Sequence, residues 1–223
     1  MLYSMFEIYF KNMKKIIVLV AFGVFSQVQS QVTFDAGVKA GYSASTISGL
    51  DADYRNSFYA GAFGSLNFTK VYNMQFEAMF LQQGVSNLRT ITTDYGSYPN
   101  NIIVQEENVR LNYLSFNLIN KFNFKKFSLH AGPGIDVKIS EPDRAPYYNY
   151  PTNDYTTFMY SNNSDIDLTV NLGLGYKITE QLSVEGRMRL GIVEPIYVNS
   201  HNYNNYSANL NRSFLVGLSY TFK

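Results

Sequence analysis

The stretch Lys126-Phe-Ser-Leu-His-Ala-Gly-Pro-Gly-Ile-Asp-Val-Lys-Ile-Ser140 alternates between two kinds of residue with almost no error. Its apolar face consists of Phe127, Leu129, Ala131, Pro133, Ile135, Val137 and Ile139. Its polar face consists of Ser128, His130, Gly132, Gly134, Asp136, Lys138 and Ser140. A period of two residues predicts a β-strand. The pattern alone fits a soluble strand on a core, and equally a membrane strand whose apolar face meets lipid and whose polar face lines a lumen.

The composition indicates one domain whose surface lies partly outside water. A chain of 223 residues is long enough for one barrel or sandwich and does not require two domains. It contains 19 Tyr, 17 Phe and no Trp, and only 16% of its residues are charged, a balance that suits contact with a membrane. It contains no cysteine, which excludes disulfides, thiolate metal sites and cysteine nucleophiles.

The N-terminal region predicts export. Residues 13–30 combine the basic pair Lys14-Lys15, the apolar run 16–25 and Ser30 before an expected cleavage site, which is the pattern of a secretory signal peptide. We expect residues 1–12 to be an overrun of the true start and residues 31–223 to form a single domain. The alternative, a short anchor that stays attached, is disfavoured because the apolar run is too short to span a bilayer.

Removing residues 1–30 takes away three of the 18 basic residues and one of the 17 acidic residues, leaving fifteen against sixteen. Such a balance gives no electrostatic footprint for nucleic acid, so we expect no nucleic-acid partner. No later run approaches the length of about 18 apolar residues that a membrane helix needs. Membrane insertion, if it occurs, must use strands.

The same alternation recurs in seven further segments, namely 32–43, 57–69, 72–84, 109–124, 166–178, 181–192 and 212–222. Longer connections at 44–56, about 85–107, 141–165 and 193–211 alternate with tight turns. All long loops therefore lie at one end, and the tight turns and both termini lie at the other. This asymmetry is typical of bacterial outer-membrane barrels, with short periplasmic turns and long extracellular loops. We predict an all-β, eight-stranded, antiparallel, up-and-down transmembrane β-barrel in the outer membrane.

The polar faces of these strands carry six cations and five anions, which are Lys39, Lys121, Lys138, Lys177, Arg187, Arg189, Asp35, Glu77, Asp136, Asp167 and Glu185. An eight-stranded barrel is only wide enough for side chains to fill its interior. A buried charge without a partner is costly, so near-balance is what a narrow lumen requires. We predict a plug of salt bridges with no open pore. The expected lumenal network contains Lys39, Glu77, Lys121, Asp136, Lys138, Glu185, Arg187 and Arg189.

Residues that could carry catalysis are few. His130 is the only histidine in a predicted strand, and Asp136 lies six residues further along the same face, roughly 20 Å away. Ser128 is adjacent on that face, but a serine in this position is too generic to define a nucleophile. His201 lies in a loop, and no metal-ligand spacing recurs. We therefore expect no enzyme activity, no cofactor and no metal, with His130 packed in the lumen.

Two of the predicted loops are rich in tyrosine interleaved with Asn, Ser and Asp; the tyrosines are Tyr147, Tyr148, Tyr150, Tyr155, Tyr160, Tyr197, Tyr203 and Tyr206. Some of them could belong to the interfacial aromatic girdle that such barrels carry. The alternative is an extracellular surface for a protein or glycan, because this mixture supplies amphipathic contact area at low entropic cost.

Five motifs, in order along nearly the whole mature chain, resemble the PorT-like family of outer-membrane β-barrel proteins. They are Gly37–Gly41, Gln75-Phe-Glu77 followed by Gln83-Gly84, Leu111–Leu114 running to Lys121, Leu129–Pro133, and Glu185–Arg187 followed by Leu190-Gly191. Ser115 and Asn117 depart from the glutamate and proline that the resemblance leads us to expect. The resemblance implies an eight-stranded outer-membrane barrel, mostly without an assigned activity. One branch of this family, PorT itself, takes part in protein secretion.

We therefore expect a structural or surface-binding barrel. It would contact outer-membrane lipid, present its loops to a possible protein or glycan, and be monomeric. The alternatives are an accessory component of a PorT-type secretion system, a small porin, or a secreted lipocalin-like barrel with an apolar interior.

Overall fold

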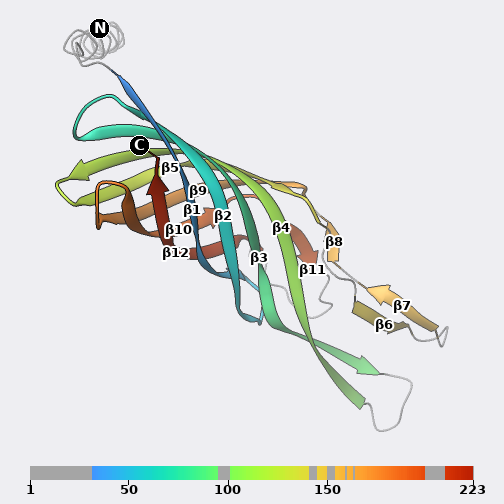
Figure 1. Ribbon diagram of the computed structural model, residues 1–223. Coiled ribbons are helices and arrows are strands. Elements are labelled where there is room, and N and C mark those ends of the chain that lie inside the picture. The colour runs from blue at the N-terminus through green and yellow to red at the C-terminus, as the bar shows by residue number, and fades with distance from the viewer. Residues whose placement is uncertain are drawn as a thin grey trace, which may run out of the picture.

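The computed structural model describes residues 32–94, 101–140, 145–149, 154–158, 160–162, 164–198 and 209–222. The eight longest strands of this part of the chain form a closed barrel (Figure 1). These strands are β1 (Thr33–Ile47), β2 (Asp53–Asn67), β3 (Tyr72–Asp94), β4 (Asn101–Phe124), β5 (Phe127–Lys138), β9 (Ile166–Lys177), β10 (Leu182–Gly191) and β12 (Asn211–Thr221). Their order around the barrel is β1-β12-β10-β9-β5-β4-β3-β2, with every neighbouring pair antiparallel. The predicted fold is confirmed.

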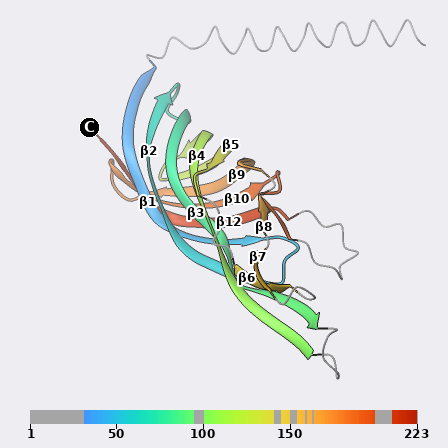
Figure 2. The same ribbon diagram turned by 90° about the vertical axis from the view of Figure 1, so that its right-hand side faces the viewer.

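Four short strands lie outside the barrel wall. They are β6 (Ala145–Asn149), β7 (Asp154–Phe158), β8 (Tyr160–Asn162) and β11 (Ile196–Val198), which form the two-stranded sheets β6–β7 and β8–β11. Both sheets sit at the end of the barrel away from the tight turns, here called the loop end (Figures 1 and 2). The predicted signal peptide and the residues before it lie outside the described part of the chain.

The prediction that residues 44–56 and 85–107 are loops was wrong for most of these positions. β1 continues to Ile47 and β2 begins at Asp53, which leaves five residues between them. Beyond a bulge between Val85 and Leu88, β3 and β4 stay paired as far as Asp94 and Asn101. The part of the β3–β4 hairpin past the bulge projects beyond the barrel (Figure 2), and its sequence mixes polar and apolar residues without the alternation that identifies a membrane strand.

The outer face of the barrel is apolar, and the inner face is largely polar. Large side chains such as Phe127 and Leu174 point outward and are 65% and 63% exposed. The charged residues of the opposite face are buried inside. A lipocalin-like barrel would have the inverse arrangement, so the structure excludes that alternative. Within the described residues, no helix has the length and apolarity needed to cross a membrane.

Aromatic side chains gather on the outer wall near the tight turns. Phe127 packs edge-on against Tyr176 with ring centroids 5.0 Å apart, and Tyr72 packs against Phe122 at 5.3 Å. The Tyr72 hydroxyl also donates to Asn120 Oδ1 at 2.7 Å, which satisfies the one amide on this otherwise apolar part of β4. Amphipathic rings at this level are what the boundary between lipid and water favours.

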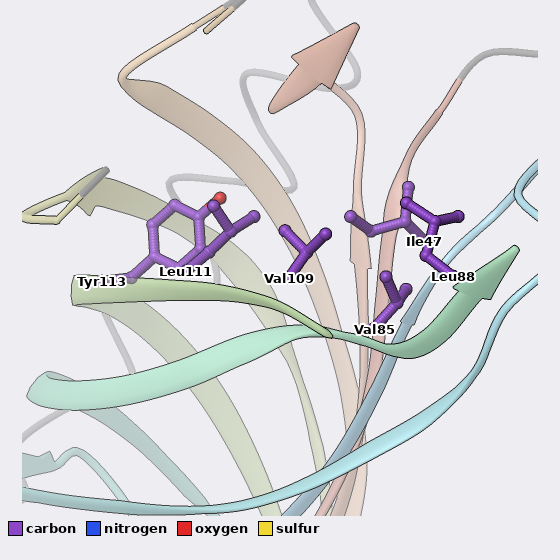
Figure 3. Packing of buried hydrophobic residues seen from close by; sticks show 6 residues of the cluster. All are labelled: Ile47, Val85, Leu88, Val109, Leu111 and Tyr113. Carbon is purple, nitrogen blue, oxygen red and sulfur yellow. The ribbon is translucent and has the colours of Figure 1, made fainter. Parts of the chain in front are cut away.

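The lumen near the loop end is filled by an apolar cluster (Figure 3), which consists of Ile47, Val85, Leu88, Val109, Leu111 and Tyr113. These side chains come from β1, β3 and β4 and are at most 2% exposed. Leu50 and Ala52, from the β1–β2 connection, pack against them. The prediction of an ionic plug therefore does not describe this part of the lumen, where hydrophobic packing closes the barrel.

Candidate functional site: the lumenal polar network

Five charged side chains meet in the lumen and form what we call the central ion cluster: Lys39, Glu77, Lys121, Glu185 and Arg187. Lys39 Nζ lies 2.7 Å from both Glu77 Oε1 and Glu185 Oε2. Lys121 Nζ lies 2.7 Å from Glu185 Oε1. The Arg187 guanidinium donates to both oxygens of Glu77, at 2.5 and 2.8 Å. All five belong to the predicted network, and the structure brings them into one connected group.

The cluster joins walls of the barrel that are far apart in sequence and in strand order. Arg187 lies on β10 and Glu77 on β3, which are opposite each other in the eight-strand circle. Their bidentate geometry fixes the relative positions of these two walls as well as their charges. Four of the five side chains are at most 5% exposed. The Arg187–Glu77 pair therefore spans the lumen and is shielded from solvent.

Neutral polar groups complete the coordination of the two carboxylates. Gln75 Nε2 donates to Glu77 Oε1 at 2.7 Å, while its Oε1 accepts from Lys121 at 3.0 Å. Ser219 Oγ donates to Glu185 Oε1 at 3.3 Å. Each carboxylate oxygen thus has at least one donor, which is the condition under which buried charges are tolerated.

A second group surrounds Arg189, which is 1% exposed. Its Nη2 donates to Asp136 Oδ1 at 2.7 Å and to Ser115 Oγ at 2.9 Å, and its Nε donates to Asn171 Oδ1 at 3.0 Å. Asn117 Oδ1 accepts from Asn171 Nδ2 at 3.1 Å in the same group. Ser115 and Asn117 are the two departures from the family pattern noted in the sequence, and here they supply neutral polar contacts beside the carboxylate of Asp136.

Asp167 is a buried charge that the predicted network left out, although it lies on the same polar face. It is paired in register with Asp136 on the neighbouring strand. Its carboxylate accepts from Asn211 Nδ2 at 3.0 Å and from the backbone N–H of Val193 at 3.2 Å. The space for it comes from Gly191, where an added Cβ would lie 2.5 Å from Asp167 Oδ2.

Several predicted positions lie outside these two groups. Lys138 sits on the inner face near the loop end, where its Nζ donates to the backbone carbonyls of Ser164 and Pro195 at 2.7 and 2.9 Å. Asp35 and Lys177, counted on the polar faces, are exposed at the rim. Lys177 pairs there with Glu180 at 3.2 Å. Both positions are too close to the strand ends for the wall to cover them.

The tyrosine-rich surface falls mainly outside what the structure describes. Tyr147, Tyr148, Tyr155, Tyr160 and Tyr197 belong to the short strands at the loop end, and their side chains lie outside the described set. Tyr150, Tyr203 and Tyr206 are outside the described residues altogether.

His130 is buried in the lumen beside Lys121 on the neighbouring strand. Its Nε2 forms a hydrogen bond with Ser128 Oγ at 2.7 Å, and its Nδ1 has no hydrogen-bond partner. A serine nucleophile with a histidine base requires a carboxylate that orients the ring. At His130, no carboxylate of the described residues takes this role. In the described part of the chain, no three His, Cys, Asp or Glu side chains are grouped to hold a metal.

The free space in the central ion cluster is very small. A cavity of about 10 Å³ is lined by Lys39, Tyr59, Met79, Glu185, Arg187 and Leu215. This volume corresponds to roughly one water molecule. The arrangement can hold the barrel walls together, and the cavity that it encloses is too small for a solute.

Comparison with known proteins agrees with this architecture. A family model described as "Outer membrane protein beta-barrel domain" matches residues 16–222. Among solved structures, the chain is similar to Ail, the attachment invasion locus protein of Yersinia pestis, with 13% identity and a TM-score of 0.46 over 84% of this chain and 98% of that one. Neisserial surface protein A has 13% identity and a TM-score of 0.45 over 86% and 100%. OprG from Pseudomonas aeruginosa has 12% identity and a TM-score of 0.43 over 87% and 99%. No curated protein matches the chain.

Proposed function

Because the chain belongs to the outer membrane protein β-barrel domain family, we propose that it is a plugged barrel that anchors a binding surface at its loop end. The body of the barrel would act as a rigid support, embedded in lipid. The loop end would contact a protein or a glycan outside the cell.

The filled lumen favours a role as a rigid support over a role in transport. The central ion cluster and the apolar cluster occupy successive levels of the same interior. A porin needs a water-filled channel, which larger barrels provide. A cavity the size of one water molecule does not supply one.

The single observation that carries the proposal is the extension of β3 and β4. Their pairing continues from Leu88 and Glu107 to Asp94 and Asn101, past the point where the other barrel strands end. Figure 1 shows this hairpin running well beyond the wall, on the same side as β6, β7, β8 and β11. Ordered strands outside the membrane contribute nothing to the lipid-facing band, so a role in contacting a partner accounts for them.

The test is to remove the loop-end elements separately and compare binding. In one variant, Asn-Gly replaces residues 89–106, because this dipeptide forms the tight turn that a two-residue hairpin needs. In a second variant, residues 145–160 are deleted. The matched control changes the opposite end of the barrel through Lys125→Ala and Lys126→Ala. Each variant is first checked for folding by the mobility shift of the barrel on heating.

Envelope pull-downs and a glycan panel then compare the variants with the intact chain. Loss of one specific protein or glycan in a loop-end variant, with the control unchanged, would support the proposal. An unchanged set of partners in both loop-end variants would refute it.

Membership of the PorT-like family is a finer proposal, supported by the five motifs noted in the sequence. If the chain is an accessory of a PorT-type secretion system, its deletion should block export of that system's substrates while leaving total envelope protein unchanged. Normal export in the deletion strain would leave the chain as a surface-binding barrel only.

A further inference from the structure

A hollow of about 640 Å³ lies in the wall across β2, β3, β4 and β5. The small residues Ala62, Gly64 and Ala78 give it depth, and Phe76 and Phe116 stand beside them. Ala62 pairs in register with Ala78, and Ala78 pairs with Phe116, so these positions form a continuous patch on neighbouring strands. The side chains of Ala62, Ala78, Phe76 and Phe116 are exposed on the outer face. The hollow therefore opens to the membrane.

The backbone under this hollow departs from a regular sheet. The pairing of β4 with β5 is interrupted between Asn117–Gly134 and Asn120–Ala131. Pro133 lies in this interval and has no N–H to donate. The neighbouring Gly132 faces the Leu118 carbonyl oxygen so closely that any side chain at this position would collide with it. The sequence thus keeps a small residue and a ring-closed residue, Gly132 and Pro133, where β4 and β5 are not paired.

The chemistry of the lining selects an apolar occupant. Glu77 and Asn117 belong to the wall here, but their side chains bond inside the lumen and do not reach the membrane side. The volume falls within the range of roughly 300–1,000 Å³ that is typical of small-molecule sites. A protein strand could not add to the wall, because a closed barrel has no free edge. An extended hydrocarbon chain is apolar, fits a volume of this size and needs no free strand edge.

We propose that this hollow is a binding site for one acyl chain of an outer-membrane phospholipid, which it holds in preference to the rest of the barrel surface. On β9, by contrast, the outward positions carry the large exposed side chains of Leu168, Val170, Leu172 and Leu174. In the hollow, the acyl chain would contact the side chains of Phe76, Phe116 and Ile135.

The chain has no tryptophan, so a single introduced tryptophan reports on one position. Phe116→Trp places the reporter in the hollow, and Phe214→Trp is the matched control on β12, opposite β4 in the circle of strands. Phe116 and Phe214 are 46% and 47% exposed. Following the pairings from Phe116 through Ala78, Ala62 and Val38 ends at Tyr220. The other way round, the pairings run from Phe116 through Ile135 to Leu168. The β9–β10 and β10–β12 registers, continued one and two residues past their last pairs, then lead to Leu210. Phe214 lies between these ends, so the two reporters sit at a similar depth.

The probe is a phosphatidylethanolamine with brominated acyl chains, which quenches tryptophan on contact. It is titrated into the full chain folded in detergent micelles. We expect quenching of Trp fluorescence in the Phe116→Trp protein to saturate once one lipid is present per barrel. In the Phe214→Trp protein, quenching should rise only in proportion to the lipid content of the micelle.

Filling the hollow should abolish the saturating part. Adding Ala78→Phe, or Ala62→Phe if the first variant does not fold, should convert the Phe116→Trp titration to the proportional form. Ala40→Phe, at another exposed alanine outside the hollow, should leave it saturable. Equal proportional quenching of both reporters, or saturation that persists when the hollow is filled, would overturn the proposal.

Discussion

Replacing Arg187 with methionine should destabilise the barrel by about 3 kcal/mol, because it removes one partner of a buried ion pair and keeps the other. Arg187 donates to both oxygens of Glu77, and no other side chain of the cluster donates to Glu77 Oε2. Glu77 Oε1 keeps Lys39 and Gln75, which places the expected loss at the lower end of the range of about 3–5 kcal/mol for breaking such pairs.

The measurement is urea unfolding of the protein reconstituted in lipid vesicles, followed by the gel shift between folded and unfolded forms and extrapolated linearly to zero urea. Lys125→Met is the matched control, because Lys125 is exposed in the β4–β5 turn and its loss should change the free energy of unfolding by less than about 0.5 kcal/mol. A double-mutant cycle with Glu77→Gln isolates the coupling between the two residues. A loss for Arg187→Met that is indistinguishable from the control would refute the assignment of this face to a sealed lumen.

Three further predictions concern other parts of the chain. Gly191→Val should destabilise the barrel by about 1–3 kcal/mol, because the new side chain displaces the Asp167 carboxylate, whereas Gly186→Val, with open space around it, should cost less in the same urea assay. Planar-bilayer recordings should detect no steady current, and large stable channels would contradict the plugged lumen. Intact-mass measurement of the envelope protein should give a chain that begins at Gln31; a mass that includes residues 13–30 would contradict the predicted signal peptide.

The barrel wall could be predicted from the sequence because lipid imposes a strict rule on it. Every second residue of a strand such as Ile166–Lys177 must be apolar where it meets hydrocarbon, and this leaves a period of two that can be counted. Where β3 and β4 leave the membrane, water accepts either kind of residue on both faces. The period disappears there, so the sequence predicts loops in place of the strands.

The composition of the lumen could be predicted, but its partners could not. The polar face identifies Glu77 and Arg187 as interior residues. Their pairing joins positions 110 residues apart and depends on the stagger of all eight strands around the barrel. The apolar cluster around Leu111 was missed for a different reason. The alternation rule distinguishes lipid from lumen, and it cannot say that part of a lumen is filled by hydrophobic packing.

The contacts of Glu185 have a consequence for how the barrel assembles. This carboxylate on β10 is held by Lys39 from β1, Lys121 from β4 and Ser219 from β12, which include the first and last strands of the wall. A partly formed barrel, with β1 and β12 still apart, would carry these charges into the bilayer without their partners, at a cost of several kcal/mol for each. Neutralisation of these charges is therefore coupled to closure of the barrel, which disfavours open intermediates within the membrane.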